Sequence, residues 1–466
     1  MASRAHWSSR LGFVLATAGS AIGLGNIWRF PYLVGQNGGC SFLIIYLCCV
    51  FGLGYFMLVG KLAFGRAAKT NVMDGFQSIG DKMGKRISPF WGRIGGALVL
   101  FNGIVISSVY VIVIGWTLFY TFAAFQALTG VEKSIDAQTG FQYLTNTFTT
   151  QFFWGSLCIV LTTIVISRGV KKGIERVALW LMPILFALLI IMLVRILLLP
   201  GAEKGIAFFL TPNWAAIGFT PDGFHLKLFS KVLLAAVGQS FYSLSLGMGV
   251  MFTYGSYLAN TNDLKKDAGW IVGLDLLVSM LAGLIVLPAV FAFGLEPSTG
   301  AGLTFITLPY VFENMWGGAF WAFLFYLLLF IAALTSLISI YEPLTALFMD
   351  KFNLTRTKAT ILTAGLNVCL FTIALASLSG KISWHLLGHN LFNAFDWITG
   401  SVSLCLTMIV CCLFMGWVGF VPIWRNFRRG SSAGRLFRSY LKRTLQITAP
   451  LLLTLLILMS FFNANP

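Results

Sequence analysis

The feature that most restricts this chain is a series of long apolar segments, because a helix needs about 20 apolar residues to cross a bilayer core. Hydrophobic residues make up 58% of the 466 residues and charged residues only 10%, against about 25% charged in an ordinary soluble domain. We therefore predict an all-α polytopic membrane protein with about 11 transmembrane helices, folded as a single transmembrane domain over residues 1–466. The predicted spans are residues 11–36, 41–64, 94–125, 152–167, 176–199, 230–258, 268–295, 318–349, 359–376, 390–424 and 442–463.

The formal net charge of +17 raises nucleic-acid binding as an alternative, which would require basic residues clustered on a soluble face. Here the basic residues occupy short loops between apolar segments, and 24 of the 32 fall in alternate loops on the side of the N-terminus. Cytoplasmic loops of membrane proteins carry such an excess. The sequence therefore predicts a cytoplasmic N-terminus, an external C-terminus and no nucleic-acid partner.

Two predicted spans are interrupted at mid-membrane depth. Residues 19–26 in span 1 and 238–249 in span 6 combine glycines with hydroxyl and amide side chains, which are poor helix formers and costly in lipid. Close helix packing through small residues is the alternative explanation, but it does not require the amides of Asn26 and Gln239. Because spans 1 and 6 would begin two five-helix halves, we predict two inverted repeats with broken helices 1 and 6. The repeats would cover about residues 11–199 and 230–424, with an extra helix at about 442–463.

A broken helix exposes two kinds of binding group. The unwound backbone frees carbonyl oxygens that can bind a hard cation such as sodium. The half-helix after the break presents free N–H groups and a positive dipole end to a carboxylate. The pattern therefore favours a site that holds a cation beside an anionic group of a substrate.

The chain contains five distinctive motifs: RAHWSSRLG at residues 4–12, GLGNIWRFPY at 23–32, NGG at 37–39, SRGVKKGIER at 167–176 and AVGQSFYSLSLG at 236–247. In these motifs the chain closely resembles the neurotransmitter:sodium symporter family, and most of all its bacterial amino-acid branch, which includes the bacterial leucine transporter. The resemblance extends over nearly the whole chain.

The resemblance implies two sodium sites with oxygen ligands only, as a hard cation prefers. The first would consist of the carbonyls of Gly19, Ile22 and Ala332 and the hydroxyls of Thr335 and Ser336. The second would consist of the Ala21 carbonyl, the Asn26 amide, the Ser243 hydroxyl and the carboxylate of the substrate itself. Because the substrate completes the second site, sodium and substrate would promote each other's binding.

The resemblance also implies the class of substrate. Tyr110 resembles the tyrosine that binds the substrate carboxylate, and Gly23 stands where monoamine-transporting relatives carry an aspartate. Since glycine leaves room for a carboxylate, we expect an α-amino acid. An apolar lining favours a neutral, hydrophobic side chain, because an unpaired charge would be costly there. The predicted substrate site is Ala21, Gly23, Gly25, Ile106, Tyr110, Tyr242, Ser243, Ser245, Met248, Ser336 and Ile340.

Charged residues near the ends of the site are expected to form gates. Arg29 with Asp396 resembles the outer ion pair of the family. Arg4 with Asp350 resembles the inner ion pair, and Trp7 and Tyr257 resemble the partners of that inner gate. Snorkelling or an ordinary loop charge is the alternative for each, but Arg29 lies beside the interruption of span 1, where a membrane charge is usually functional.

Three positions depart from the family pattern. Leu274 aligns where the first sodium site usually takes an asparagine, Ser20 replaces an asparagine, and Lys61 occupies a position that is commonly glutamate. Asp275, next to Leu274, either supplies the missing sodium ligand or replaces the chloride that animal members bind. A purely structural hydrogen bond from Asp275 to a nearby hydroxyl is the third possibility, and the sequence leaves the three open. The chloride of those members would lie near Tyr46, Gln239 and Ser243.

An intramembrane metalloenzyme and a passive channel are the two alternative function classes. An intramembrane metalloenzyme would have to use His385 and His389, which are spaced one helical turn apart but lack the glutamate of a zinc protease motif. A passive channel would need a continuous polar pore, whereas the polar groups here cluster at mid-depth.

We therefore predict a sodium-coupled secondary active symporter, not an enzyme, which works by alternating access in a bacterial cytoplasmic (inner) membrane. It would carry a neutral, hydrophobic α-amino acid with two sodium ions and without a requirement for chloride. Another small zwitterion is the alternative substrate. Membrane lipid is the other expected partner, and the sequence leaves the oligomeric state open.

Overall fold

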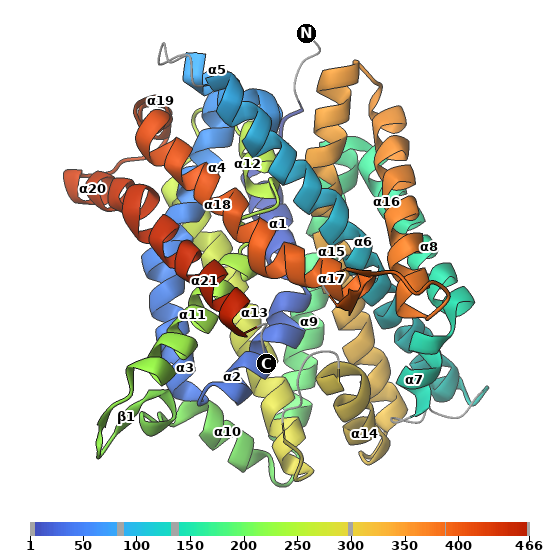
Figure 1. Cartoon of the computed structure of the whole chain (residues 1–466). Helices are drawn as coiled ribbons and strands as arrows, with labels where there is room; N and C mark the ends of the chain where they lie inside the picture. Colours follow the sequence, from blue (N-terminus) through green and yellow to red (C-terminus); the bar gives the residue numbers. More distant parts are fainter. Residues whose placement is uncertain (1–4, 82–87, 132–138, 297–301, 387, 464–466) are drawn as a thin grey trace.

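The protein folds almost entirely into helices, as a computed structural model of the chain shows (Figure 1). The structure describes residues 5–81, 88–131, 139–296, 302–386 and 388–463. The helical segments of the first half are α1 (Arg10–Ala21), η1 (Gly25–Arg29), α2 (Phe30–Gln36), α3 (Cys40–Cys49), η2 (Val50–Gly54), α4 (Tyr55–Ala68), α5 (Val72–Asp81), α6 (Ser88–Thr129), α7 (Thr139–Asn146), α8 (Phe148–Ser167), η3 (Val170–Glu175) and α9 (Arg176–Leu197).

The second half repeats this predominance of helix and adds two short antiparallel hairpins. The segments up to the long helix α15 are α10 (Ala202–Leu210), η4 (Ala215–Ile217), β1 (Phe219–Thr220), β2 (Gly223–Phe224), α11 (Leu226–Ser243), α12 (Val250–Ser256), α13 (Leu264–Ala292), η5 (Leu303–Thr307), α14 (Leu308–Glu313) and α15 (Gly318–Phe352). The remainder are α16 (Arg356–Leu378), β3 (His385–Leu386), β4 (His389–Asn390), α17 (Leu391–Trp397), η6 (Ile398–Ser403), α18 (Leu404–Leu413), η7 (Phe414–Val418), α19 (Phe420–Phe427), α20 (Arg435–Arg443), η8 (Thr444–Thr448) and α21 (Ala449–Asn463).

The polytopic membrane architecture is confirmed. Within the described ranges, nine helices are long and apolar enough to cross a membrane, and ten if α1 and the bent segment that follows it count as one span. The predicted count of eleven is not confirmed, because predicted span 6 is divided into α11 and the seven-residue α12. A divided helix offers no single long apolar run, although its two pieces lie where the sequence placed the span.

Both predicted interruptions are present. In span 1 the helix ends at Ala21, Ile22 is extended at φ −75° and ψ 105°, and the axis turns by 52° before the chain continues as η1 and α2. In span 6 the residues between α11 and α12 form turns, with positive φ at Ser245 (50°) and Gly249 (78°). A positive φ is strained for serine, and such strain is typical of functional segments.

The helices divide into a central group and a peripheral group. About three quarters of the apolar windows of α6 and α15 are buried inside the protein, whereas only one third is buried in α8 and in α16. Helices α6 and α15 pack along each other in the middle of the bundle (Figure 1). Peripheral helices expose large apolar side chains such as Trp180, which suits contact with lipid. The polar interruptions therefore lie against the central helices and away from the lipid.

The spacing of His385 and His389 does not produce a helical turn. His385 pairs with Asn390 and Leu386 pairs with His389 across the hairpin β3–β4. Both imidazoles are exposed, and His385 contacts only the Ser383 carbonyl. In the described part of the chain, no three His, Cys, Asp or Glu side chains are grouped so that they could hold a metal ion.

Candidate functional site

The broken part of span 1 and helix α15 bring backbone and hydroxyl oxygens together. The Ser336 hydroxyl lies 3.4 Å from the Gly19 and Ser20 carbonyl oxygens and 3.3 Å from that of Ile22. These carbonyls are available because α1 ends here and cannot use them within the helix. The contact is fully buried and joins residues more than 300 positions apart in sequence.

Thr335 and Ala332 complete this group on α15. The Thr335 hydroxyl donates to the Ala332 carbonyl at 3.0 Å and to the Ile331 carbonyl at 3.2 Å. All five members of the first predicted sodium site are therefore buried oxygen-bearing residues on two adjacent elements, α1 and α15. A set of neutral oxygens without nitrogen, sulfur or carboxylate suits a hard cation of low charge.

A second polar cluster joins span 1, span 6 and α13. The Asn26 amide nitrogen lies 2.7 Å from Asp275 Oδ1, 3.0 Å from Ser243 Oγ and 2.9 Å from Ser279 Oγ. The Ser243 hydroxyl lies 2.8 and 2.9 Å from the two oxygens of Asp275. The Asp275 side chain is completely buried, and among the described residues no Lys, Arg or His nitrogen lies within 4 Å of its carboxylate. A buried carboxylate that is held by neutral donors is energetically demanding, which marks it as more than a packing residue.

Two further polar side chains border this cluster. The Gln239 amide nitrogen donates to the Gly25 carbonyl at 2.9 Å, while its own oxygen is buried without a hydrogen-bond partner among the described residues. The Tyr46 side chain is completely buried beside Ser243 and Ser279. Both residues belong to the set that the family resemblance associates with chloride. Ala21 lies at the end of α1 and Asn26 accepts from the Gly23 N–H at 3.1 Å, so the second predicted sodium site adjoins the break.

A small cavity of about 30 Å³, here called the central cavity, lies between the two interruptions. Its lining contains all eleven residues of the predicted substrate site, together with Ser20 and Leu24. The Leu24 N–H donates to the Tyr110 hydroxyl at 3.5 Å, and the Ser245 hydroxyl donates to the Ser20 carbonyl at 2.8 Å. The sequence approach placed Ser20 and Leu24 within the interrupted segment but did not assign them to the site.

Gly23 occupies the narrowest part of this cavity. A Cβ atom at this position would lie 2.5 Å from Ser336 Oγ and 3.1 Å from the Tyr110 hydroxyl. Real Cβ atoms do not approach so closely, so any side chain at position 23 would displace one of these hydroxyls. The space beside the Tyr110 hydroxyl and the Leu24 N–H is therefore kept open by the absence of a side chain.

A second cavity of about 490 Å³, here called the wide cavity, adjoins the central one and shares Leu24, Gly25, Ile106, Tyr110 and Tyr242 with its lining. Arg29 and Asp396, the predicted outer gate, both line it. They do not form an ion pair within 4 Å; instead the Arg29 guanidinium lies 4.8 Å from the centre of the Tyr242 ring. The two charges thus border an open space at this end of the site.

At the opposite end of the site, aromatic side chains fill the space beside the start of α1. The Trp7 indole N–H donates to the Tyr254 carbonyl at 3.1 Å, and the Trp7 ring packs edge-on against Tyr254 and Tyr257. The Tyr257 hydroxyl donates to Glu342 at 2.7 Å, and Glu342 forms an ion pair with Arg356. This end is therefore closed by packing and by a buried polar network.

The predicted ion pair of Arg4 and Asp350 cannot be described, because Arg4 lies outside the described residues. Asp350 itself accepts hydrogen bonds from the backbone and side-chain nitrogens of Asn71, at 3.2 and 2.9 Å.

Two buried acidic residues at the closed end were missed by the sequence approach. Glu342 is completely buried within α15. Glu175 accepts four hydrogen bonds, from the N–H and hydroxyl groups of Ser8 and Ser9 at the start of α1. An acidic residue inside a long apolar segment is unusual, so the sequence could have identified Glu342. Glu175 lies among other charged residues in a loop, and nothing in the local sequence distinguishes it from them.

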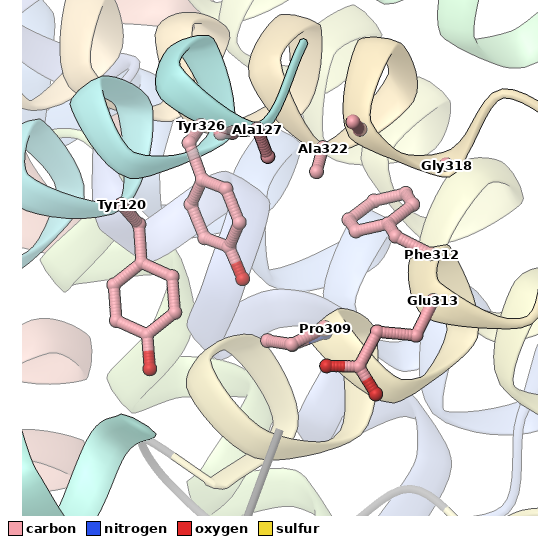
Figure 2. A pocket seen from close by; sticks show the side chains of 10 residues that line it. Tyr120, Ala127, Pro309, Phe312, Glu313, Gly318, Ala322 and Tyr326 are labelled. Carbon is pink, nitrogen blue, oxygen red and sulfur yellow. The ribbon is translucent and has the colours of Figure 1, made fainter. Parts of the chain in front are cut away.

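A further cavity of about 40 Å³ lies away from both interruptions, beside α14 (Figure 2). The Tyr120 hydroxyl donates to the Phe305 carbonyl at 3.2 Å and the Tyr326 hydroxyl to the Thr304 carbonyl at 2.8 Å. These bonds hold η5 and α14 against α6 and α15. The described residues that line this cavity include none of the predicted substrate or sodium ligands, so it is separate from the candidate site.

Comparisons with known proteins agree with this arrangement. Residues 4–133 and 151–466 match the Sodium:neurotransmitter symporter family. An uncharacterized sodium-dependent transporter of Haemophilus influenzae is 34% identical, over 91% of this chain and 94% of its own length. The uncharacterized sodium-dependent transporter YhdH of Bacillus subtilis is 36% identical, over 92% of each chain. The crystal structure of MhsT in complex with L-phenylalanine superposes with a TM-score of 0.85 at 34% identity, over 98% of this chain and 100% of that one.

Proposed function

The chain belongs to the sodium:neurotransmitter symporter family, an integral membrane family of sodium-dependent transporters and not of enzymes, and from this premise we propose that it transports a neutral α-amino acid with an apolar side chain. The observation that carries the proposal is the central cavity beside Gly23. The Tyr110 hydroxyl, the Ser336 hydroxyl and the backbone of Leu24 border it, and a side chain at position 23 would clash with Ser336. Those donors suit a carboxylate, which is the group that every α-amino acid shares.

The walls of the central cavity support the choice of an apolar side chain. Ile106, Met248 and Ile340 supply aliphatic and thioether surface, and Tyr242 supplies an aromatic face. Burial of a charged side chain against this lining would cost several kcal/mol without a partner. The similarity to MhsT, solved in complex with L-phenylalanine, makes phenylalanine the first probe.

We assign two sodium ions to the site. One would bind the carbonyls and hydroxyls around Ser336, and the other would bind near Asn26 and Ser243 with the carboxylate of the substrate as a ligand. Shared ligation would couple ion and substrate binding reciprocally. Two sodium ions that accompany one zwitterion would gain about 4.6 kcal/mol per 100 mV of membrane potential, at about 2.3 kcal/mol per charge.

Asp275 is proposed to replace chloride. It is a buried acidic side chain beside Ser243, with the polar groups of Tyr46 and Gln239 nearby. Its negative charge would balance a bound sodium ion without an added anion. Direct ligation of sodium by Asp275 is the competing role, and the two roles differ in their response to chloride.

Alternating access is proposed to operate between the two ends of the site. Arg29 and Asp396 would close the wide cavity over the substrate, while release on the other side would require Trp7, Tyr257 and their partners to separate. The residues 11–199 and 230–424 would act as inverted repeats, with the N-terminus cytoplasmic and the C-terminus external. In that orientation the wide cavity faces outward.

The decisive experiment is uptake by purified protein in liposomes. Labelled L-phenylalanine should accumulate when an inward sodium gradient is imposed, and should not when sodium is equal on both sides or replaced by potassium. Equal uptake in potassium would contradict sodium-coupled symport. A thermal-shift screen of the twenty amino acids, each with and without sodium, would then identify the substrate; stabilisation by none of them would favour another small zwitterion.

A further inference from the structure

The segment from the end of α19 through α20 is strongly basic. Residues 425–443 carry seven basic side chains and no acidic residue. The seven are Arg425, Arg428, Arg429, Arg435, Arg438, Lys442 and Arg443. Helices α19 and α20 lie at one edge of the molecule, on the same half as the N-terminus (Figure 1). Charge of one sign at this density is costly unless an anion is nearby.

Between α19 and α20 the structure contains a polar cavity of about 850 Å³. Arg428, Arg429 and Lys265 line it, together with Thr261 and the segment 430–434. Arg428, Arg429 and Lys265 are all exposed here, so their N–H donors are accessible from the cavity. Guanidinium groups bind phosphate oxygens through paired N–H donors.

No carboxylate in the described part of the chain lies within 4 Å of these seven basic side chains. Several instead rest on aromatic rings: Arg438 lies 5.9 Å from the centre of the Trp424 ring and Lys442 lies 5.9 Å from that of Phe420. Lys265 lies 5.6 Å from the centre of the Phe437 ring. Cation–π contacts position a cation while leaving N–H groups free to donate, so the positive charge remains available to an anion.

The cavity is held in shape by buried contacts. Arg66 is fully buried and donates to the Asn426 side-chain oxygen at 2.8 Å, the Asn426 carbonyl at 2.9 Å and the Asn262 carbonyl at 2.6 Å. Gly430 packs so closely that a Cβ there would lie 2.2 Å from the Asn262 carbonyl oxygen. The end of α19 and the following loop are therefore fixed before any ligand binds, which reduces the entropic cost of binding.

Helix α20 adds an apolar path that begins beside the cavity. Leu436 is 88% exposed and Tyr440 is 48% exposed, and they lie on one side of a helix that continues through residue 460 without a break long enough to end it. Exposed apolar side chains continue along the same helix at Ile447, Leu451, Leu455 and Leu458. Spacings of three, four and seven residues place them on one stripe. A basic cavity at the head of an apolar stripe matches a phospholipid, with a headgroup and acyl chains, better than a soluble anion or a nucleic acid.

We propose that the cavity between α19 and α20 binds the phosphate of an anionic phospholipid, through Arg428 and Arg429, with the acyl chains along the exposed stripe that starts at Leu436. The site is distinct from the central cavity, and the proposal does not depend on which substrate the protein carries.

The test uses the full-length protein in nanodiscs of phosphatidylcholine, with and without phosphatidylglycerol of the same acyl chains. Lipid affinity is read from the shift in unfolding temperature as phosphatidylglycerol is titrated. Arg428→Gln/Arg429→Gln should weaken the response about tenfold. Lys171→Gln/Lys172→Gln, which removes the same charge from exposed positions in η3, should leave it unchanged.

An equal loss in both double variants would overturn the proposal, since it would mean that only the general surface charge attracts the lipid. Protection by inorganic phosphate in place of the lipid would also overturn it, by indicating a soluble-anion site. If Arg428→Gln/Arg429→Gln unfolds at a lower temperature in pure phosphatidylcholine, the single variants Arg428→Gln and Arg429→Gln provide the test. An undiminished response to phosphatidylglycerol in both single variants would refute the assigned contacts.

Discussion

Gly23 and Ser336 approach each other so closely that a Cβ on the glycine would lie 2.5 Å from the serine hydroxyl oxygen. One residue comes from the break in span 1 and the other from the middle of α15. Ser336 also touches the freed carbonyls of Gly19 and Ile22. The proposed carboxylate position and the proposed first sodium site therefore share a side chain, so that a change at one is expected to affect the other.

Gly23→Ala is expected to weaken amino-acid binding by about tenfold or more, because the added methyl group must displace Ser336 or Tyr110. The measurement is the concentration of amino acid that half-saturates the thermal shift and the uptake. Gly365→Ala is the matched control, since a Cβ there meets nothing within 4 Å and the residue is exposed on α16. Equal affinities in Gly23→Ala and the wild type would show that the substrate does not bind at this position.

Thr335→Val is expected to raise the sodium concentration needed for half-maximal uptake by about tenfold, because it removes a proposed sodium ligand while keeping the shape of the side chain. Thr372→Val is the control. The Thr372 hydroxyl also bonds to a carbonyl of its own helix, at 2.7 Å from that of Val368, but lies in α16 away from the site. If both variants need similarly more sodium, the effect would come from the lost hydrogen bond within each helix and not from the loss of a sodium ligand.

Asp275→Asn is expected to convert chloride-independent transport into transport that chloride stimulates, because the asparagine keeps the size but removes the buried negative charge. Uptake is compared in chloride and in gluconate at constant sodium. If Asp275 instead ligates sodium directly, the variant will need more sodium and show no chloride response. Asp222→Asn, in an exposed turn, should behave as the wild type does. Unchanged transport in Asp275→Asn would refute both roles.

Glu342→Gln is expected to lower stability by about 3 kcal/mol, because it leaves Arg356 without its buried partner. The side chain of Glu342 is fully buried and that of Arg356 is 17% exposed. Glu342→Gln/Arg356→Gln should be more stable than Glu342→Gln, which unfolding temperatures in detergent will show. Lys351→Gln breaks the exposed pair with Asp74 and should cost about 1 kcal/mol or less. A double variant less stable than the single one would argue against a charge-pair explanation.

The proposed orientation predicts which positions an impermeant thiol reagent reaches. In a background where the exposed Cys48 and Cys369 are replaced by serine, Asp222→Cys should be labelled in intact cells. Gly434→Cys, where a side chain meets nothing within 4 Å, should be labelled only after the cells are opened. The reverse pattern would invert the orientation.

Part of the site could be predicted from local sequence. The interruptions at residues 19–26 and 238–249 were visible because glycine, serine and amide residues at mid-membrane depth conflict with a continuous helix. The family resemblance then indicated the site residues of α6 and α15, including Ile106, Tyr110 and Ile340. No periodicity in those apolar helices distinguishes these residues from their neighbours.

Other features depended on distances between remote segments. The Asn26 amide bonds to Asp275, which is 249 positions away. Ser8 and Ser9 bond to Glu175, and Tyr257 bonds to Glu342. Sequence alone could state that these groups are polar and costly in a membrane, but not which of them satisfy one another. The count of eleven spans is not confirmed for a related reason. Span 6 is broken into α11 and the seven-residue α12, and neither piece is both long and apolar enough to count as a membrane span by itself.

By itself, the sequence determined that the chain is a helical membrane protein with two broken spans, and it predicted the direction in which the chain faces. Those properties follow from apolar length, helix propensity and the distribution of charge, all of which act locally along the chain. Only the tertiary structure decided that Ser336 meets the carbonyls of span 1, that Asp275 has neutral partners, that one end of the site is open while Trp7 fills the other, and that Arg428 and Arg429 line a cavity. These contacts depend on how the helices pack against one another. Differences of a few tenths of an ångström decide whether two oxygens can bind the same ion or form a hydrogen bond.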